Sequence, residues 1–239
     1  MIKLLIISDD FTGALDTGVK FSAAGARTRV STDTQIDFRQ EIAEEVLVLC
    51  APTRHLPPRE AYDMIRSIAQ RAVAAHIGCV YKKTDSALRG NIGAELSAVL
   101  DGSGEKCLSF IPALPGMNRI TVDGVHYIDG VPVDQSVFGQ DPFEPVTESR
   151  VPDLLHLQCD VPVKVISPEE LDSFRPGEEK CIYLFDCASR EDMEREAQRL
   201  YLLGCLKLLA GCAGLAESLP GYLGLRMGEK PQCRIEANR

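Results

Sequence analysis

Short apolar runs alternate along most of the chain with longer segments in which apolar residues recur every three or four positions. The short runs predict strands at 3–7, 28–31, 45–50, 79–82 and 106–111. The longer segments predict helices at 14–24, at 59–75 and from Ile92 through Leu100. Because right-handed crossovers join neighbouring parallel strands, this alternation predicts an α/β fold with a mostly parallel sheet flanked by helices.

The pattern changes after Pro112, where polar residues and turn dipeptides replace the helical spacing. Asp123-Gly124 and Asp129-Gly130 separate stretches of alternating residues within 121–133, which is typical of β-hairpins. We therefore expect a β-hairpin and loop insertion around 112–150.

The strand pattern resumes at 181–185 and 206–209, with a helical segment between them. Ser189 precedes this helix and Asp192 follows three residues later, which is the spacing of a capping box with Asp in the Glu position. The chain therefore returns to the strand and helix alternation after the insertion.

The composition is that of an ordinary soluble globular protein, with 45% hydrophobic residues in a chain of 239. A chain of this length buries roughly 70–75% of its unfolded surface, so it can form its own core. Its net charge of −9 repels nucleic-acid backbones and anionic membranes, and no basic patch offsets that charge. We expect neither a nucleic-acid partner nor a membrane partner.

Signals for targeting and for membrane insertion are weak. The apolar run 4–7 ends at Asp9-Asp10, so it is too short and too closely followed by acid to resemble a secretory signal. The segment 200–216 is the most membrane-like stretch, but Lys207 and three glycines interrupt it. We expect no spanning helix there.

The cysteines indicate a reducing compartment. Nine cysteines contain no Cys-x-x-Cys pair, and Cys50, Cys107 and Cys181 lie in strand-like runs where a reduced thiol packs as a small hydrophobe. The four histidines are dispersed, so no metal site is expected. A cytoplasmic location fits this usage best.

Polar residues cluster directly after two of the predicted strands. One cluster is 9–13, Asp-Asp-Phe-Thr-Gly, and the other is 82–91, Lys-Lys-Thr-Asp-Ser-Ala-Leu-Arg-Gly-Asn. The carboxyl ends of parallel strands meet at one edge of a sheet, where ligands gather in open α/β folds. We therefore expect the two clusters to share one rim.

The first cluster admits two interpretations. Asp10 or Thr12 can cap the following helix, and the amide dipoles there can stabilise both Asp9 and Asp10. Alternatively, one carboxylate accepts a proton from a substrate hydroxyl or fixes a polyol. The adjacent spacing argues against an aspartyl-phosphate enzyme, for which we expect Asp-x-Asp.

The second cluster concentrates cations in an acidic protein. Lys82, Lys83 and Arg89 lie within eight residues, just before a predicted helix start. A guanidinium fork suits a carboxylate, and a helix N-terminus adds free amides. A small anionic substrate would fit this loop, although a solvated loop with outward-pairing lysines would have the same sequence.

Nucleotide-binding signals are poor. Neither a P-loop motif nor a dinucleotide-binding glycine motif follows any predicted strand. The segment 211–214, Gly-Cys-Ala-Gly, follows a strand-like run, but two glycines at this spacing are more typical of tight packing than of a phosphate cradle.

Several motifs together resemble the N-terminal domain of the four-carbon acid sugar kinase family, in order and in spacing. They are Ser-Asp-Asp-Phe-Thr-Gly-Ala-Leu-Asp-Thr-Gly at 8–18, Thr-Arg-His-Leu-Pro-Pro-Arg-Glu-Ala at 53–61, Tyr-Lys-Lys-Thr-Asp-Ser-Ala-Leu-Arg-Gly-Asn-Ile-Gly-Ala-Glu-Leu at 81–96 and Asp-Pro-Phe-Glu-Pro-Val-Thr-Glu-Ser at 141–149. Pro112 to Pro115 with Arg119 and Thr121, the hairpin end 129–132, and 211–217 extend the similarity over nearly the whole chain.

The resemblance implies ATP-dependent phosphorylation of a terminal hydroxyl on threonate, erythronate or an oxo-tetronate. In such a kinase the N-terminal domain binds the acid, and a C-terminal domain supplies ATP and Mg²⁺. We accordingly expect one domain at 1–225 and a polar tail or linker at 226–239. The second domain would then be a separate part or partner chain, and homo-oligomers are compatible with this arrangement. A non-catalytic sugar-acid binding module is the alternative.

The resemblance also assigns site residues. Asp10 or Asp9 would orient or deprotonate the acceptor hydroxyl. The residues implied to hold the acid are Thr12, Gly13, Arg54, Lys83, Asp85, Ser86, Arg89, Gly90 and Asn91. The chain departs from the family at Cys212, where Ser is frequent, and at 116–118, which puts hydroxyl chemistry at position 212 in doubt.

Overall fold

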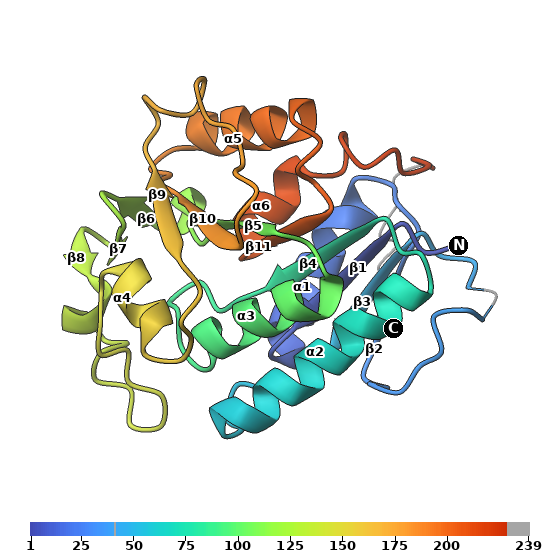
Figure 1. Ribbon diagram of the computed structural model, residues 1–239, viewed down its shortest axis with the longest axis horizontal. Coiled ribbons are helices and arrows are strands. Elements are labelled where there is room, and N and C mark those ends of the chain that lie inside the picture. Colours follow the sequence, from blue (N-terminus) through green and yellow to red (C-terminus); the bar gives the residue numbers. More distant parts are fainter. Residues whose placement is uncertain (41, 229–239) are drawn as a thin grey trace, which may run out of the picture.

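The computed structural model describes residues 1–40 and 42–228, which form a large parallel sheet and a small antiparallel one (Figure 1). In spatial order the large sheet comprises β2 (Thr28–Ser31), β3 (Val46–Cys50), β1 (Leu4–Ser8), β4 (Cys79–Lys83), β11 (Leu208–Gly211), β5 (Cys107–Ile111), β10 (Cys181–Phe185) and β9 (Val163–Ile166). All neighbouring strands are parallel. The predicted α/β fold with a mostly parallel sheet is confirmed.

Helices cover both faces of this sheet (Figure 1). The helices are α1 (Phe11–Ala23), α2 (Pro58–Ala74), α3 (Ile92–Ser103), α4 (Val151–His156), α5 (Arg190–Leu202) and α6 (Ala213–Ser218). One hydrophobic core joins the sheet to α2, α3 and α4, and a second joins it to α1, α5 and α6. The two layers are needed because β1, β3 and β4 are buried at every position, as expected for central parallel strands.

The helix starts follow from local chemistry. Asp10 is the N-cap of α1 and accepts the amide of Gly13, so the capping role predicted for Asp10 is confirmed. Ser189 and Asp192 form the predicted capping box of α5. Pro58 stands at the first position of α2, where its missing N–H costs nothing.

The insertion after β5 folds as the small sheet. It contains the short helical turns η1 (Pro115–Met117) and η2 (Val133–Gln135) and the antiparallel strands β6 (Arg119–Val122), β7 (Val125–Ile128) and β8 (Val131–Pro132). The two predicted turns join these strands, with positive φ at both residues of Asp123-Gly124 and of Asp129-Gly130. Short polar side chains and glycine tolerate this conformation best. The antiparallel pairing of β6 with β7 and of β7 with β8 confirms the hairpin prediction.

Two elements beyond the insertion were not predicted, and one strand lies later than expected. The strand β9 alternates Lys164 with valines over only four residues at the sheet edge, and α4 is a single short segment. Both patterns are too short to stand out from loop sequence. β11 begins at Leu208 rather than 206, and Leu208 is its first residue in register with β4, opposite Val80.

The membrane-like segment 200–216 is divided between the end of α5, β11 and the start of α6. Across 1–40 and 42–228, no helix combines the length and the apolar character needed to cross a bilayer. Of the predicted tail 226–239, residues 229–239 lie outside the described part. Arg226 still contacts the domain, since its amide donates to Glu45 Oε2 at 2.7 Å.

Candidate functional site

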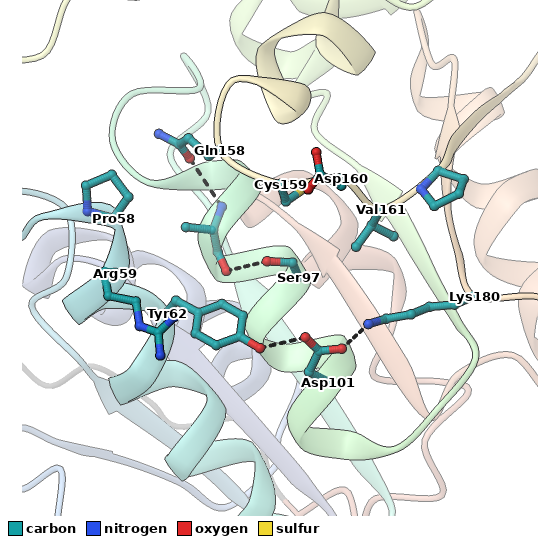
Figure 2. Close-up of a pocket in the computed structure, with 12 residues that line it drawn as sticks. Pro58, Arg59, Tyr62, Ser97, Asp101, Gln158, Cys159, Asp160, Val161 and Lys180 are labelled. Carbon is teal, nitrogen blue, oxygen red and sulfur yellow. Dashed lines mark hydrogen bonds and ion pairs between the residues drawn. The ribbon is translucent and has the colours of Figure 1, made fainter.

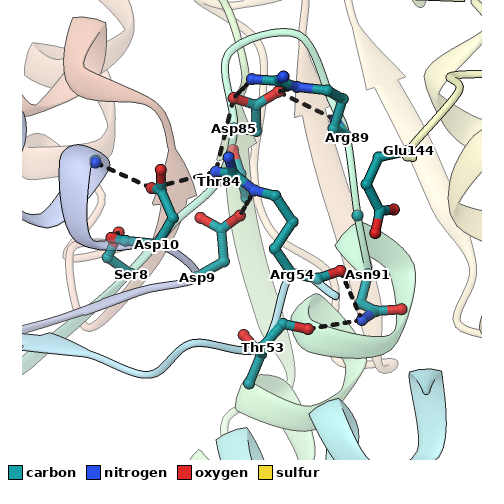
Figure 3. Close-up of polar contacts among 12 residues, drawn as sticks. Ser8, Asp9, Asp10, Thr53, Arg54, Thr84, Asp85, Arg89, Asn91 and Glu144 are labelled. Atoms are coloured by element: carbon teal, nitrogen blue, oxygen red, sulfur yellow. Dashed lines mark hydrogen bonds and ion pairs between the residues drawn. The ribbon is translucent and has the colours of Figure 1, made fainter. Parts of the chain in front are cut away.

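Three adjacent strands deliver polar side chains to one edge of the sheet. β1 lies between β3 and β4, and Ser8 is in register with both Cys50 and Lys83, the last residues of those strands. The segments that follow the three strands therefore begin side by side, as Figure 3 shows. The predicted shared rim is confirmed.

Arg54, from the loop after β3, lies at the centre of this edge. Its guanidinium contacts three carboxylates, with Nε 2.7 Å from Asp9 Oδ2 and Nη2 3.2 Å from Asp10 Oδ1 and 3.7 Å from Asp85 Oδ1. Burial lowers the pKa of Arg54, but these three carboxylates outweigh burial and the net shift is upward. Arg54 stays charged and draws the two predicted clusters together.

The two adjacent aspartates differ in exposure. The Asp9 side chain is 2% exposed and its Oδ1 is buried without a hydrogen-bond partner, whereas the Asp10 side chain is 28% exposed. Asp10 Oδ1 accepts the Gly13 amide at 3.0 Å, and Oδ2 accepts no hydrogen bond from the described residues. Asp10 thus offers a free carboxylate oxygen at the rim (Figure 3), while Asp9 is held beneath Arg54.

The two lysines of β4 point to opposite faces, as successive strand residues must. The Lys82 ammonium is fully buried and forms an ion pair of 2.8 Å with Glu95 of α3. Glu95 also accepts a hydrogen bond from the hydroxyl of Thr53, just before Arg54. Burial raises the pKa of Glu95, and Lys82 acts against that shift. Lys82 therefore does not add to the cationic rim, contrary to the expectation for the 82–91 cluster.

Lys83 faces the start of α1. Its ammonium donates to the carbonyl of Thr84 at 2.7 Å, and no carboxylate among the described residues forms an ion pair with it. A Cβ at position 13 would lie 2.9 Å from Lys83 Nζ and 2.5 Å from Asp10 Oδ1. Gly13 therefore lets the ammonium approach the first turn of the helix closely.

Arg89 is engaged within the chain. Its Nε and Nη2 donate to the two oxygens of Asp85 at 2.9 and 3.1 Å, and Nη1 donates to Asp141 at 3.3 Å. Burial raises the pKa of Asp85, but Arg89 and Arg54 outweigh burial and bring it to about 2. Binding of the acid's carboxylate by Arg89 stays a prediction, and the carboxylate would have to compete with both aspartates.

Gly90 and Asn91 fix the loop that carries Arg54. Gly90 has φ +85°, and a Cβ there would lie 2.9 Å from Arg54 Cγ. The Asn91 amide donates to the carbonyls of Thr53 and Leu56, both at 2.8 Å. These two residues meet the backbone after β3, whereas Thr12 is exposed on the first turn of α1.

Ser86 joins the loop after β4 to the hairpin insertion. Its hydroxyl accepts a hydrogen bond from Arg119 of β6, and its carbonyl accepts one from His126 Nε2 at 3.0 Å. Because the proton of the ring is then on Nε2, His126 Nδ1 accepts a hydrogen bond from the hydroxyl of Thr121 at 3.0 Å. Burial lowers the pKa of His126 to about 4, so the ring is neutral at ordinary pH.

Phe138, from the long loop after β8, lies against both guanidiniums at this end of the site. The ring centroid is 5.1 Å from Arg89 and 5.2 Å from Arg119, within cation–π range. Sequence reasoning missed Phe138, His126 and Asp141 as site neighbours. Asp141 is the first residue of the 141–149 motif, and Arg119 lies in another segment that matches the family. For these two residues, the family resemblance was the only indication in the sequence.

The glycines at 211–214 are explained by packing. A Cβ at Gly211 would lie 2.4 Å from the carbonyl oxygen of Ile111, and one at Gly214 would lie 2.6 Å from that of Ala113. The buried thiol of Cys212 donates to Ala113 O at 3.1 Å. The tight-packing interpretation is confirmed. Within the described ranges, no three His, Cys, Asp or Glu side chains are grouped to hold a metal ion.

A groove of about 540 Å³ lies between α2, α3 and the segment around Val161 (Figure 2). Its polar groups bind one another. Asp101 accepts hydrogen bonds from Tyr62 at 2.6 Å and from Lys180, and the side-chain oxygen of Gln158 accepts the amide of Ala94 at 3.2 Å. None of the residues predicted for the site lines this groove.

Comparisons with known proteins agree with the resemblance. Residues 4–219 match the family model of a sugar-binding N-terminal domain. The chain is 32% identical to a D-threonate kinase of Salmonella typhimurium over 228 residues, and 29% identical to a D-erythronate kinase of Heliobacterium modesticaldum over 239. These alignments cover 92% and 93% of this chain but only 53% and 54% of the relatives. The chain thus spans about half the length of these curated relatives.

Solved structures show the same architecture. A domain of unknown function from Bordetella bronchiseptica, crystallised with citrate as a domain-swapped dimer, superposes with a TM-score of 0.79 at 30% identity. The superposition covers 91% of this chain and 55% of that one. On the family match and the named relatives together, the chain belongs to the sugar-binding N-terminal domain family of the four-carbon acid sugar kinases.

Proposed function

We propose that this chain is the acid-binding half of a kinase that phosphorylates a terminal hydroxyl of a four-carbon sugar acid. The free oxygen of Asp10 at the rim is the observation that carries the proposal, since it can accept the proton of an acceptor hydroxyl. The names of the relatives, which include a 3-oxo-tetronate kinase of Escherichia coli, support threonate, erythronate or an oxo-tetronate as substrate.

In this proposal Asp10 orients and deprotonates the hydroxyl. Arg54 fixes Asp10, Asp9 and Asp85 relative to one another, and Lys83 places a positive charge beside the start of α1. Phosphoryl transfer depends mostly on positioning and charge neutralisation, which is the part these side chains can perform. Thr12, Gly13, Ser86, Gly90 and Asn91 complete the walls around the acid.

ATP and Mg²⁺ would be supplied from the portion of the kinase that this chain does not span, as a domain or as a partner chain. Packing is sufficient to explain the glycines after β11, so their presence does not require a phosphate cradle there. A cytoplasmic, homo-oligomeric assembly would be compatible with this role. A non-catalytic sugar-acid binder is the second candidate, because the same packing of Gly211 and Gly214 would suit it equally.

Calorimetric titration of the purified chain with D-threonate, D-erythronate and a 3-oxo-tetronate tests the binding half of the proposal. We expect saturable binding of at least one acid, and no turnover with Mg-ATP at ordinary kinase rates of roughly 1–100 per second. Absence of binding to all three acids would refute the proposal. Ordinary turnover by the chain alone would refute the half-enzyme assignment.

The role of Asp10 is tested in a mixture with the product of the coding sequence that adjoins this chain's own. If that sequence encodes a nucleotide-binding half, the mixture should phosphorylate the acid, and Asp10→Asn should lower kcat by about 10²- to 10⁴-fold with little change in KM. Asp9→Asn, which loosens Arg54, should raise KM as well. Acid binding without any turnover in the mixture would favour the non-catalytic binder.

A further inference from the structure

The charges at the strand-end site do not balance evenly. Lys82 is matched by Glu95, and Arg54 lies among three aspartates. Arg89 has one aspartate on each side of its guanidinium. Each of these cations already has a carboxylate partner, so an incoming acid would have to displace that partner before binding.

Two cations at the same edge lack such a partner. Lys83 donates to the Thr84 carbonyl and Arg119 donates to the Ser86 hydroxyl, and neither forms an ion pair with any carboxylate in the described ranges. Five N–H donors are available on a guanidinium, so the bond to Ser86 leaves Arg119 with most of its capacity. These two side chains are the natural partners of a ligand's negative charge.

Lys83 and Arg119 lie at opposite ends of the segment from Lys83 to Ser86, the first within it and the second bound to its last residue. Lys83 adjoins Asp10 at the start of α1, whereas Arg119 adjoins Ser86 at the hairpin. Burial raises the pKa of the Cys212 thiol, and both cations act against that shift, so both lie near the end of β11. The Cα atoms of Lys83 and Ser86 are at most about 10 Å apart, so both ends of this segment are within reach of one small ligand.

We propose that Arg119 binds the carboxylate of the substrate, so that the hairpin insertion selects acids over uncharged polyols. This inference rests on the proposed function and assigns the two ends of the acid. The hydroxyl end lies at Asp10 and Lys83, and the carboxylate lies at Arg119 beside Ser86. Phe138 stacks on the Arg119 guanidinium and leaves its N–H edge free to form a charge-assisted, two-bond contact.

The test compares variants of two stacked arginines. Arg119→Met removes the proposed contact, and Arg71→Met is the matched control. Arg71 lies 5.2 Å from the Phe38 ring, as Arg119 does from Phe138, but its guanidinium donates to the carbonyls of Thr34 and Ile36 rather than to a residue predicted for the site. Calorimetric titration uses D-threonate and threitol, which has no carboxylate. Melting temperatures are measured on the same samples.

We expect Arg119→Met to weaken D-threonate binding by about 30- to 150-fold, the value of a charge-assisted two-bond contact, and to leave threitol affinity unchanged. Arg119→Lys should retain part of the affinity, because it keeps the charge and loses the fork. Arg71→Met should change only the melting temperature.

Two outcomes would overturn the inference without touching the proposed function. In the first, wild-type chain binds D-threonate and both Arg119 variants bind it equally well. In the second, Arg119→Lys, which keeps the positive charge beside Phe138, loses threitol and D-threonate affinity in equal measure, which indicates a structural role. Failure of wild-type chain to bind any tetronate refutes the proposed function instead.

Discussion

The groove between α2 and α3 and the strand-end site differ in how their charges are used. The groove is a hollow of about 540 Å³, yet Asp101 is satisfied by Tyr62 and Lys180. At the strand ends, Asp9 Oδ1 is buried without a partner and Arg119 has no carboxylate among the described residues. A large pocket is the usual first candidate for a binding site. Here polar groups without a partner, rather than the volume of a pocket, indicate where a bound ligand would form the most favourable contacts.

The largest expected effect comes from the buried pair beneath the strand-end site. Glu95→Gln leaves the Lys82 ammonium buried and unpaired, which should lower the free energy of unfolding by about 3–5 kcal/mol. Urea denaturation at neutral pH measures the change. The double variant Lys82→Met with Glu95→Gln is the control, and it should recover much of the loss because no buried charge remains.

A loss below about 1 kcal/mol for Glu95→Gln would contradict this prediction. It would mean that the Lys82–Glu95 pair adds as little to the free energy of unfolding as the partly exposed pair in the groove. The contrast between the two regions would then rest on Asp9 and Arg119 alone.

Low pH should destabilise the fold through His126 of the hairpin insertion. The pKa of His126 is about 4 in the folded chain, because burial lowers it from the ordinary value of 6.5, so the unfolded chain binds the extra proton between these values. The free energy of unfolding should therefore fall as the pH falls from 6.5 towards 4, by about 3 kcal/mol from this ring. Thermal melts across that range measure the slope.

His126→Gln serves as the comparison, because its amide can still donate to the Ser86 carbonyl and accept from Thr121. Between pH 6.5 and 4, the pH dependence of its free energy of unfolding should be weaker than that of wild type, by an amount that corresponds to at most one proton. An unchanged slope would show that His126 is not the group that titrates there.

The smallest effect is expected in the groove. Asp101→Asn breaks partly exposed contacts with Lys180, so stability should change by no more than about 1 kcal/mol. D-threonate affinity should stay within about twofold of wild type, as calorimetry can determine. A tenfold loss of affinity would move the acid site into the groove and reverse the comparison.

Much of the sheet was predictable from sequence because most of its strands are short runs rich in apolar and β-branched residues. The strands at 28–31 and 181–185 were predicted at their observed bounds, and β4 extends one residue beyond its prediction. The shared rim followed from the common direction of parallel strands. Asp9 and Asp10 could not be distinguished, because neighbouring aspartates differ only in the burial that Arg54 imposes from another loop.

The remainder depended on contacts between distant segments. Lys82 and Lys83 look alike in sequence and both are buried, and only the position of Glu95 on α3 pairs one of them with a carboxylate. Arg119 and Phe138 reach the loop after β4 through the tertiary placement of the insertion. No local period encodes such a meeting, so pattern reasoning could not find it.

The position of β11 in the sheet has a consequence for folding during synthesis. β11 is the last strand in the described part of the chain, yet it lies between β4 and β5, which do not pair with each other. Until residues 208–211 emerge from the ribosome, the nascent chain holds two separate half-sheets with exposed inner edges. The edge that carries Asp10 and Asp85 therefore gains its final wall only when residues 208–211 have been synthesised, and the incomplete halves depend on rapid closure to avoid pairing with other chains.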